Sequence, residues 1–118
     1  MARLRIEGEE LVLDLSGLEK LEGFHGNIHV PVASVREVRF TNDPWSELRG
    51  IRAPGTGVPG VIAVGTRRGS GIKDFAAIHG HGPAVVVELE RADYGRLVVT
   101  EEDAESAARE LKHQLGLG

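Results

Sequence analysis

The chain has 118 residues, of which 41% are hydrophobic and 27% charged, and its formal net charge is -4. This length supports one hydrophobic core, so we predict a single domain over residues 1–118. The lack of cysteine excludes disulfides, thiolate metal sites and a cysteine nucleophile. Only 4% of the residues are aromatic, and together with the acidic balance this argues against nucleic-acid binding.

No segment has the composition of a targeting or membrane-spanning sequence. The basic residues near the first methionine are not followed by an apolar stretch, so we expect no secretory signal peptide. The longest purely apolar runs, such as 61–64 and 84–87, are far shorter than the ~20 residues that cross a bilayer. We therefore predict a cytoplasmic protein without a transmembrane segment.

Seven segments show the apolar alternation of strands that bury one face. They lie at residues 11–15, 28–30, 38–40, 61–66, 72–78, 85–89 and 97–99. The links between them are mostly short and rich in turn residues, which leaves no room for helical crossovers. We predict that neighbouring strands are antiparallel.

Helical periodicity appears at the end of the chain. The pattern predicts one amphipathic helix with Thr100 as its N-cap and Gly116 near its end. Pro44 suits the first position of a second, short helical turn. The apolar stripe of the terminal helix consists of Ala104, Ala108, Leu111 and Leu115.

Seven antiparallel strands followed by one helix resemble the pleckstrin-homology-like (PH-like) barrel, which has two sheets and a C-terminal helix over one open end. Residues 28–38 look like the strand, proline turn and strand of small bacterial members, and 98–111 are similar to their last strand and helix. The resemblance covers a core of about residues 9–115. It implies a mainly β bacterial protein, and self-association, because small bacterial members form homo-oligomers.

Phosphoinositide-binding members of this family gather lysines and arginines between their first two strands. The matching segment here, 16–27, holds Lys20 beside Glu19 and Glu22. This departure argues against phosphoinositide binding.

Residues 55–60 match the G-x-G-x-x-G string of dinucleotide-binding loops. That loop needs a strand before it and a helix after it, because the helix N-terminus binds the pyrophosphate. Here the string precedes a predicted strand, and Pro54-Gly55 and Pro59-Gly60 fit paired type II turns. We predict turns and no cofactor.

Basic residues concentrate between positions 48 and 73, where no acidic residue occurs. The strands that contain Val64 and Phe75 can pair. Arg67, Arg68 and Lys73 would then converge at one hairpin end, beside glycine amides that an anion can contact. The alternatives are a solvated rim or a contact with an acidic partner. The candidate residues for an anion or partner are Arg49, Arg52, Arg67, Arg68 and Lys73.

Two further features admit two interpretations each. His79 and His81 are two residues apart, and with His25 or His29 they form a weak metal-site pattern. The interleaved glycines favour a surface turn instead, so we predict no metal. The single tryptophan, Trp45, either closes the core or anchors a partner at an interface.

These observations favour a non-catalytic binding or assembly module whose partner is another protein or a second copy of the chain. One alternative is a receptor for a small anion or anionic headgroup at the basic hairpin end. Another is a histidine-based metal or enzymatic site. No serine lies in a nucleophile elbow, so we name no catalytic residue.

Overall fold

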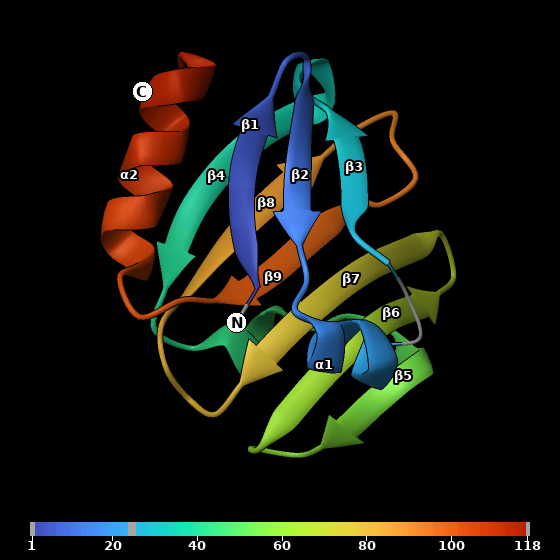
Figure 1. Cartoon of the computed structure of the whole chain (residues 1–118). Helices are drawn as coiled ribbons and strands as arrows, with labels where there is room; N and C mark the ends of the chain where they lie inside the picture. Colours follow the sequence, from blue (N-terminus) through green and yellow to red (C-terminus); the bar gives the residue numbers. More distant parts are fainter. Residues whose placement is uncertain (1, 24–25, 118) are drawn as a thin grey trace.

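The computed structural model describes residues 2–23 and 26–117, with the side chains of 52–54 left undescribed. Over these residues the chain forms two β-sheets, two α-helices and two short 3-10 helices (Figure 1). The mainly β composition, the two sheets and the C-terminal helix are confirmed. The number and order of the strands differ from the prediction.

The smaller sheet has three antiparallel strands in the order β1-β2-β3. They are β1 (Arg3–Glu7), β2 (Glu10–Asp14) and β3 (Ile28–Pro31). A two-residue turn that begins at Gly8, with a φ of +60°, joins β1 to β2. Strand β1 was not predicted, so the folded domain begins before the expected core boundary at residue 9.

The larger sheet has the strand order β4-β8-β9-β7-β6-β5. Its members are β4 (Val35–Thr41), β5 (Ile51–Val58), β6 (Ile62–Gly69), β7 (Ile72–His79), β8 (Ala84–Leu89) and β9 (Arg96–Thr100). Strand β9 lies between β7 and β8 and runs parallel to β7. The prediction that neighbouring strands are all antiparallel is therefore wrong here. The link 80–83 joins β7 to β8 across two strand spacings of about 4.8 Å each. It is long enough to do so as an extended chain, without a helix.

The sheets pack face to face, and their inner faces form one core that includes Leu11, Leu13, Phe75 and Val85. Within the described residues no strand of one sheet pairs with a strand of the other, so the two sheets do not close into the predicted seven-stranded antiparallel barrel. Strand β3 ends at Pro31, which has no N–H to donate. The 3-10 helix η1 (Val32–Ser34) then carries the chain to the other sheet.

Helix α2 (Ala104–Leu115) packs against β4 and β8 and lies beside β1 (Figure 1). Its N-cap residue is Asp103. The predicted N-cap, Thr100, is instead the last residue of β9, where its hydroxyl accepts a hydrogen bond from the His79 N–H at 3.1 Å. The helix ends at Gly116, whose φ of +69° provides the left-handed cap that favours glycine. Its buried stripe contains Ala104, Ala108 and Leu111.

Helix α1 (Gly17–Gly23) lies where the sequence analysis expected a loop. Its start is a reciprocal capping box between Ser16 and Glu19. The Ser16 hydroxyl accepts from the Glu19 N–H at 3.1 Å, and the Glu19 carboxylate accepts from the Ser16 N–H at 2.9 Å. The predicted short helical turn at Pro44 is present as the 3-10 helix η2 (Pro44–Glu47).

The G-x-G-x-x-G string forms the end of β5 and the turn into β6. The turn is closed by the Val61 N–H donating to the Val58 carbonyl at 2.9 Å, and Gly60 adopts a φ of +78°, as a type II turn requires. The other predicted turn, at Pro54-Gly55, is wrong because both residues belong to β5. Gly55 is needed for close packing, since a Cβ there would lie 2.4 Å from the Val64 carbonyl oxygen.

Candidate functional site

Arg49, the first of the predicted anion-binding residues, is held by a carboxylate of the same chain. Its Nε and Nη2 each donate to the Asp74 carboxylate at 2.8 Å. The Asp74 side chain is only 3% exposed, and its hydrogen bonds to Arg49 raise the pKa of that guanidinium. The pair ties the segment after η2 to strand β7.

The other cations of the basic stretch do not all share one binding surface. Arg67 donates to the carbonyl oxygens of Arg49 and Gly50 at 3.1 and 2.8 Å. The Lys73 ammonium lies 4.8 Å from the centroid of the Tyr94 ring, a cation–π contact. Arg67 and Arg68 are consecutive in β6 and so lie on opposite faces of the sheet.

The side chain of Arg52 lies outside the described residues. Arg68 is the cross-strand partner of Lys73, so these two cations do lie together near the hairpin end, as predicted. The described contacts therefore bring together two of the five predicted residues. They direct Arg49 and Arg67 toward the chain's own carboxylate and carbonyl groups.

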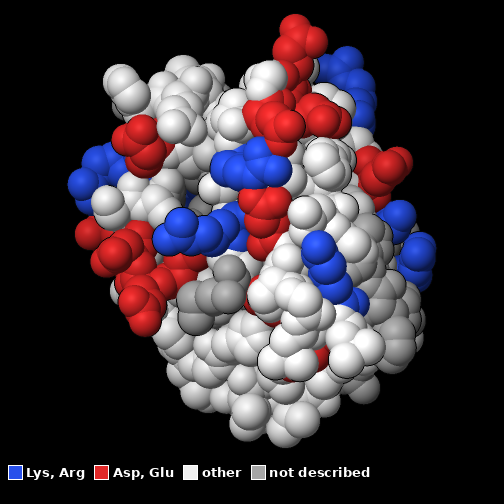
Figure 2. Space-filling model, in the orientation of Figure 1, with Lys and Arg blue, Asp and Glu red and all other residues white. Residues whose placement is uncertain are grey.

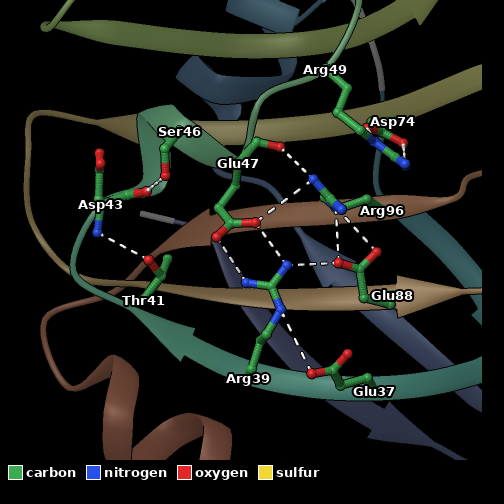
Figure 3. Close-up of polar contacts among 10 residues, drawn as sticks. All are labelled: Glu37, Arg39, Thr41, Asp43, Ser46, Glu47, Arg49, Asp74, Glu88 and Arg96. Atoms are coloured by element: carbon green, nitrogen blue, oxygen red, sulfur yellow. Dashed lines mark hydrogen bonds and ion pairs between the residues drawn. The ribbon is translucent and has the colours of Figure 1, made fainter.

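A connected group of charges lies on the outer face of the larger sheet, which is the face turned away from the smaller sheet (Figure 3). We call Arg39, Glu47, Glu88 and Arg96 the outer network. Arg39 donates two hydrogen bonds to Glu47, at 2.7 and 2.8 Å, and a third to Glu88 at 2.7 Å. Arg96 lies 3.0 Å from the same Glu88 carboxylate.

The outer network keeps its two carboxylates ionised. Hydrogen bonds from Arg39 lower the pKa of Glu47. Burial by itself would raise the pKa of Glu88, but the hydrogen bonds from Arg96 and Arg39 outweigh it and the net pKa is lowered. Both partners of Glu88 are arginines of its own chain.

Trp45 covers an apolar cluster on the same outer face. Its Nε1–H donates to the Gly80 carbonyl at 2.8 Å, and its ring packs beside a cluster that contains Ala76, Ile78 and Val98. The ring centroid of His81 lies 6.1 Å away. These contacts favour the packing interpretation of Trp45 over the interface interpretation.

The candidate histidines make separate contacts. His79 faces helix α1, with Nδ1 3.6 Å from Glu19 and Nε2 3.5 Å from Glu22, whereas His81 lies by Trp45. His29 is 3.3 Å from Glu10 on the exposed face of the smaller sheet. His25 lies outside the described residues, and within the described ones no group of histidine and acidic side chains could hold a metal ion.

An open cleft separates strand β1 from helix α2. It has a volume of about 600 Å³ and continues past Arg3 and Glu101 into a second hollow of about 540 Å³. Figure 2 shows this side of the molecule hollowed between the helix and the small sheet, with charged side chains on the rims. Apolar side chains line the cleft on both sides, namely Leu4, Ile6, Val85, Ala107 and Leu111.

The polar groups of this β1–α2 cleft come from both of its walls. Arg3 and Arg5 project from β1, and Glu110 and Gln114 from α2. Glu101 lies at the end where β9 leads into the helix, and burial raises the pKa of its carboxyl although Arg3 opposes the shift. The cleft therefore has apolar walls, with Arg3 and Arg5 on one rim, Arg5 being ion-paired with Asp14 and Glu7, and an acidic rim on the other side.

Strand β1 is an edge of the smaller sheet, since over the described residues it pairs with β2 alone. The backbone groups on its other side face the cleft. Native proteins cover, charge or shorten such edges because an unpaired strand attracts another strand. Helix α2 stands near this edge but leaves the cleft between them.

Several apolar side chains are exposed elsewhere. Leu18 and Leu21 of α1 are 65% and 70% exposed, and Val61 after β5 is 59% exposed. The lower part of Figure 2, over α1, β5 and β6, carries few charged side chains. This surface is apolar, but its contacts do not indicate a particular partner.

The cleft residues were missed by the sequence analysis. Their signal is nevertheless present in part, because Leu4 and Ile6 alternate with Arg3, Arg5 and Glu7 in a five-residue strand pattern. The opposite wall, Ala107 and Glu110, carries no comparable signal. Only the packing of α2 places it next to β1.

Comparisons of the chain with family models, with curated proteins and with solved structures found no match. Within the described residues, no helix has both the length and the apolar character to cross a membrane. The functional proposal therefore rests on the geometry of the chain itself.

Proposed function

We propose that the chain is a non-catalytic protein-binding module that holds a segment of a partner protein in the β1–α2 cleft. The observation that carries this proposal is the free edge of β1 beside an open cleft with apolar walls. Edge strands next to apolar pockets are a recurring mode of peptide recognition. The mode needs no cofactor and no reacting group.

The size and character of the cleft support a peptide-like ligand. Its volume of about 600 Å³ lies within the range of roughly 300–1,000 Å³ that is usual for ligand sites. Apolar walls between Leu4 on β1 and Leu111 on α2 provide burial, while the charged rims provide selectivity. The remaining predicted alternatives have less support, because Arg49 and Arg67 are bonded to groups of the chain itself and the histidines make separate contacts.

A peptide-display selection on the intact chain tests the proposal. We expect selected peptides to lose binding to Ala107→Trp, which places a large side chain in the cleft, by about tenfold or more. Arg109→Trp is the matched control, because it adds the same ring to the exposed side of α2, outside the cleft residues. Equal binding to the two variants, or a selection that enriches no peptide, would contradict the proposal.

Kinship with PH-like domains stays part of the proposal. Two packed sheets and a C-terminal helix support it, and the parallel pairing of β7 with β9 argues against it. Self-association also stays a prediction. Light scattering that gives a strict monomer at both low and high salt would remove it.

A further inference from the structure

The pairing of β1 with β2 determines which backbone groups of β1 are free. A two-residue turn connects them, and the residues next to it, Glu7 and Glu10, are cross-strand partners. Such flanking residues exchange hydrogen bonds, and the pattern then alternates along an antiparallel pair. The N–H and C=O groups of Arg3 and Arg5 thus point toward β2. Those of Leu4 and Ile6 point toward the cleft.

The side chains around this edge favour an alternating ligand. Leu4 and Ile6 are partly buried and line the cleft, whereas the intervening Arg5 is exposed. A strand added beside β1 places every second side chain over the same apolar floor, near Val85 and Leu111. The other side chains of the ligand then lie outward, beside Arg5.

The charges differ between the two ends of the cleft. Glu101, Glu102 and Asp103 lie together where α2 begins, and Arg3 is the cation that shares this hollow with them. With Glu110, which lines the same hollow, four carboxylates face one guanidinium and leave this end acidic. A lysine or arginine of the ligand would balance that excess and bind there through charge-assisted hydrogen bonds.

The neighbouring helix leaves space beside β1 for a single added strand but not for the sheet of a second copy. An intact sheet edge carries its own next strand about 4.8 Å farther out. Helix α2 occupies that side of the cleft, with Ala107 and Leu111 on its wall. A lone extended segment therefore fits between β1 and α2, and a second copy's β1–β2 pair does not.

Building on the proposed function, we infer that the partner segment binds as an added fourth strand on β1. It alternates apolar and polar residues, and a lysine or arginine at one end lies beside Glu101, Glu102 and Asp103. Its main-chain bonds go to Leu4 and Ile6. This specifies the class of ligand as an extended, basic-ended segment of another protein.

Hydrogen exchange with a display-selected peptide tests the main-chain part. We expect the amide hydrogens of Leu4 and Ile6 to exchange about tenfold more slowly when the peptide is bound. The Arg5 amide, already bonded to β2, serves as the internal control and changes little. N-methylation of the peptide should weaken binding at every second position. Unchanged exchange at Leu4 and Ile6, or sensitivity at consecutive positions, would overturn the inference.

The charge is tested with the same peptide and a norleucine replacement of its terminal lysine or arginine. We expect about a tenfold loss of affinity toward the unmodified chain and little further loss toward Glu101→Gln combined with Glu102→Gln. Equal losses toward both chains would overturn the basic-end assignment. Binding that Ala107→Trp abolishes, without the alternating pattern, would leave the proposed function standing and reject the added strand.

Discussion

The outer network and the β1–α2 cleft lie on opposite faces of the larger sheet, and both combine arginines with carboxylates. In the outer network, Arg39 and Arg96 are hydrogen-bonded to Glu47 and Glu88 within the chain. In the cleft, Glu101 shares its hollow with Arg3 and three further carboxylates. A cluster of charges therefore indicates a binding site only when its partners within the chain leave some of those charges unmatched.

The largest effect is expected at the buried carboxylate next to the outer network. Asp74→Ala removes two hydrogen bonds to Arg49, and we expect the free energy of unfolding to fall by about 2 kcal/mol. Because the Arg49 side chain is 37% exposed, water can solvate it in the variant, and this limits the loss of stability. Urea denaturation measures it, with exposed Asp93→Ala as the control. A loss equal to that of the control would show that the pair is not structural.

The second prediction concerns how much the outer network contributes to stability at acidic pH. Glu47→Gln weakens the double hydrogen bond from Arg39, and we expect a loss of about 1 kcal/mol at neutral pH. Because the folded pKa of Glu47 is lowered, its contribution is present above the unfolded value of about 4.3 and is lost as pH falls through the folded pKa. Denaturation across acidic pH should therefore show the variant and the unmodified chain converging. A constant difference would refute this.

At the cleft, the pH dependence of stability should have the opposite sign. Burial raises the folded pKa of Glu101, so its ionised form disfavours folding, and that penalty appears as pH rises through the folded pKa. We expect Glu101→Gln to raise the free energy of unfolding at neutral pH by up to about 0.5 kcal/mol and to change little below about pH 4. The same denaturation series measures it. Destabilisation at neutral pH would mean that Glu101 has a stabilising partner.

The smallest effect is expected for Ala107→Trp. Because the cleft is open, the added ring should change the free energy of unfolding by no more than about 0.5 kcal/mol. Thermal denaturation checks this, with Arg109→Trp beside it. A large loss for Ala107→Trp alone would show that the cleft is tightly closed in solution and contradict its assignment as a ligand site.

Local patterns predicted much of the secondary structure. Helix α2, its apolar stripe and its Gly116 end follow from spacing alone, and so does the turn at Gly60. Helix α1 was missed although Ser16 and Glu19 form the capping-box pattern. That signal was outweighed by the interpretation of the surrounding residues as a loop.

The strand order and the site could not be predicted from these patterns. The place of β9 depends on pairing with β7 and β8, which short-range alternation does not encode. For the same reason the basic stretch suggested a site, since Asp74, the partner of Arg49, lies one residue beyond the acid-free segment and pairs with it only in the fold. The cleft joins residues from the two ends of the chain.

The position of β9 also bears on how the chain folds. Before residues 96–100 are in place, the larger sheet exists only as two pieces, β4 with β8 and β5 with β6 and β7. Strand β9 joins them, and four of its residues pair with β7 while five pair with β8. During synthesis from the N-terminus, both pieces therefore keep an unpaired edge until β9 has been made. We expect its insertion to complete cooperative folding, and chains stopped before it to be the most prone to aggregation.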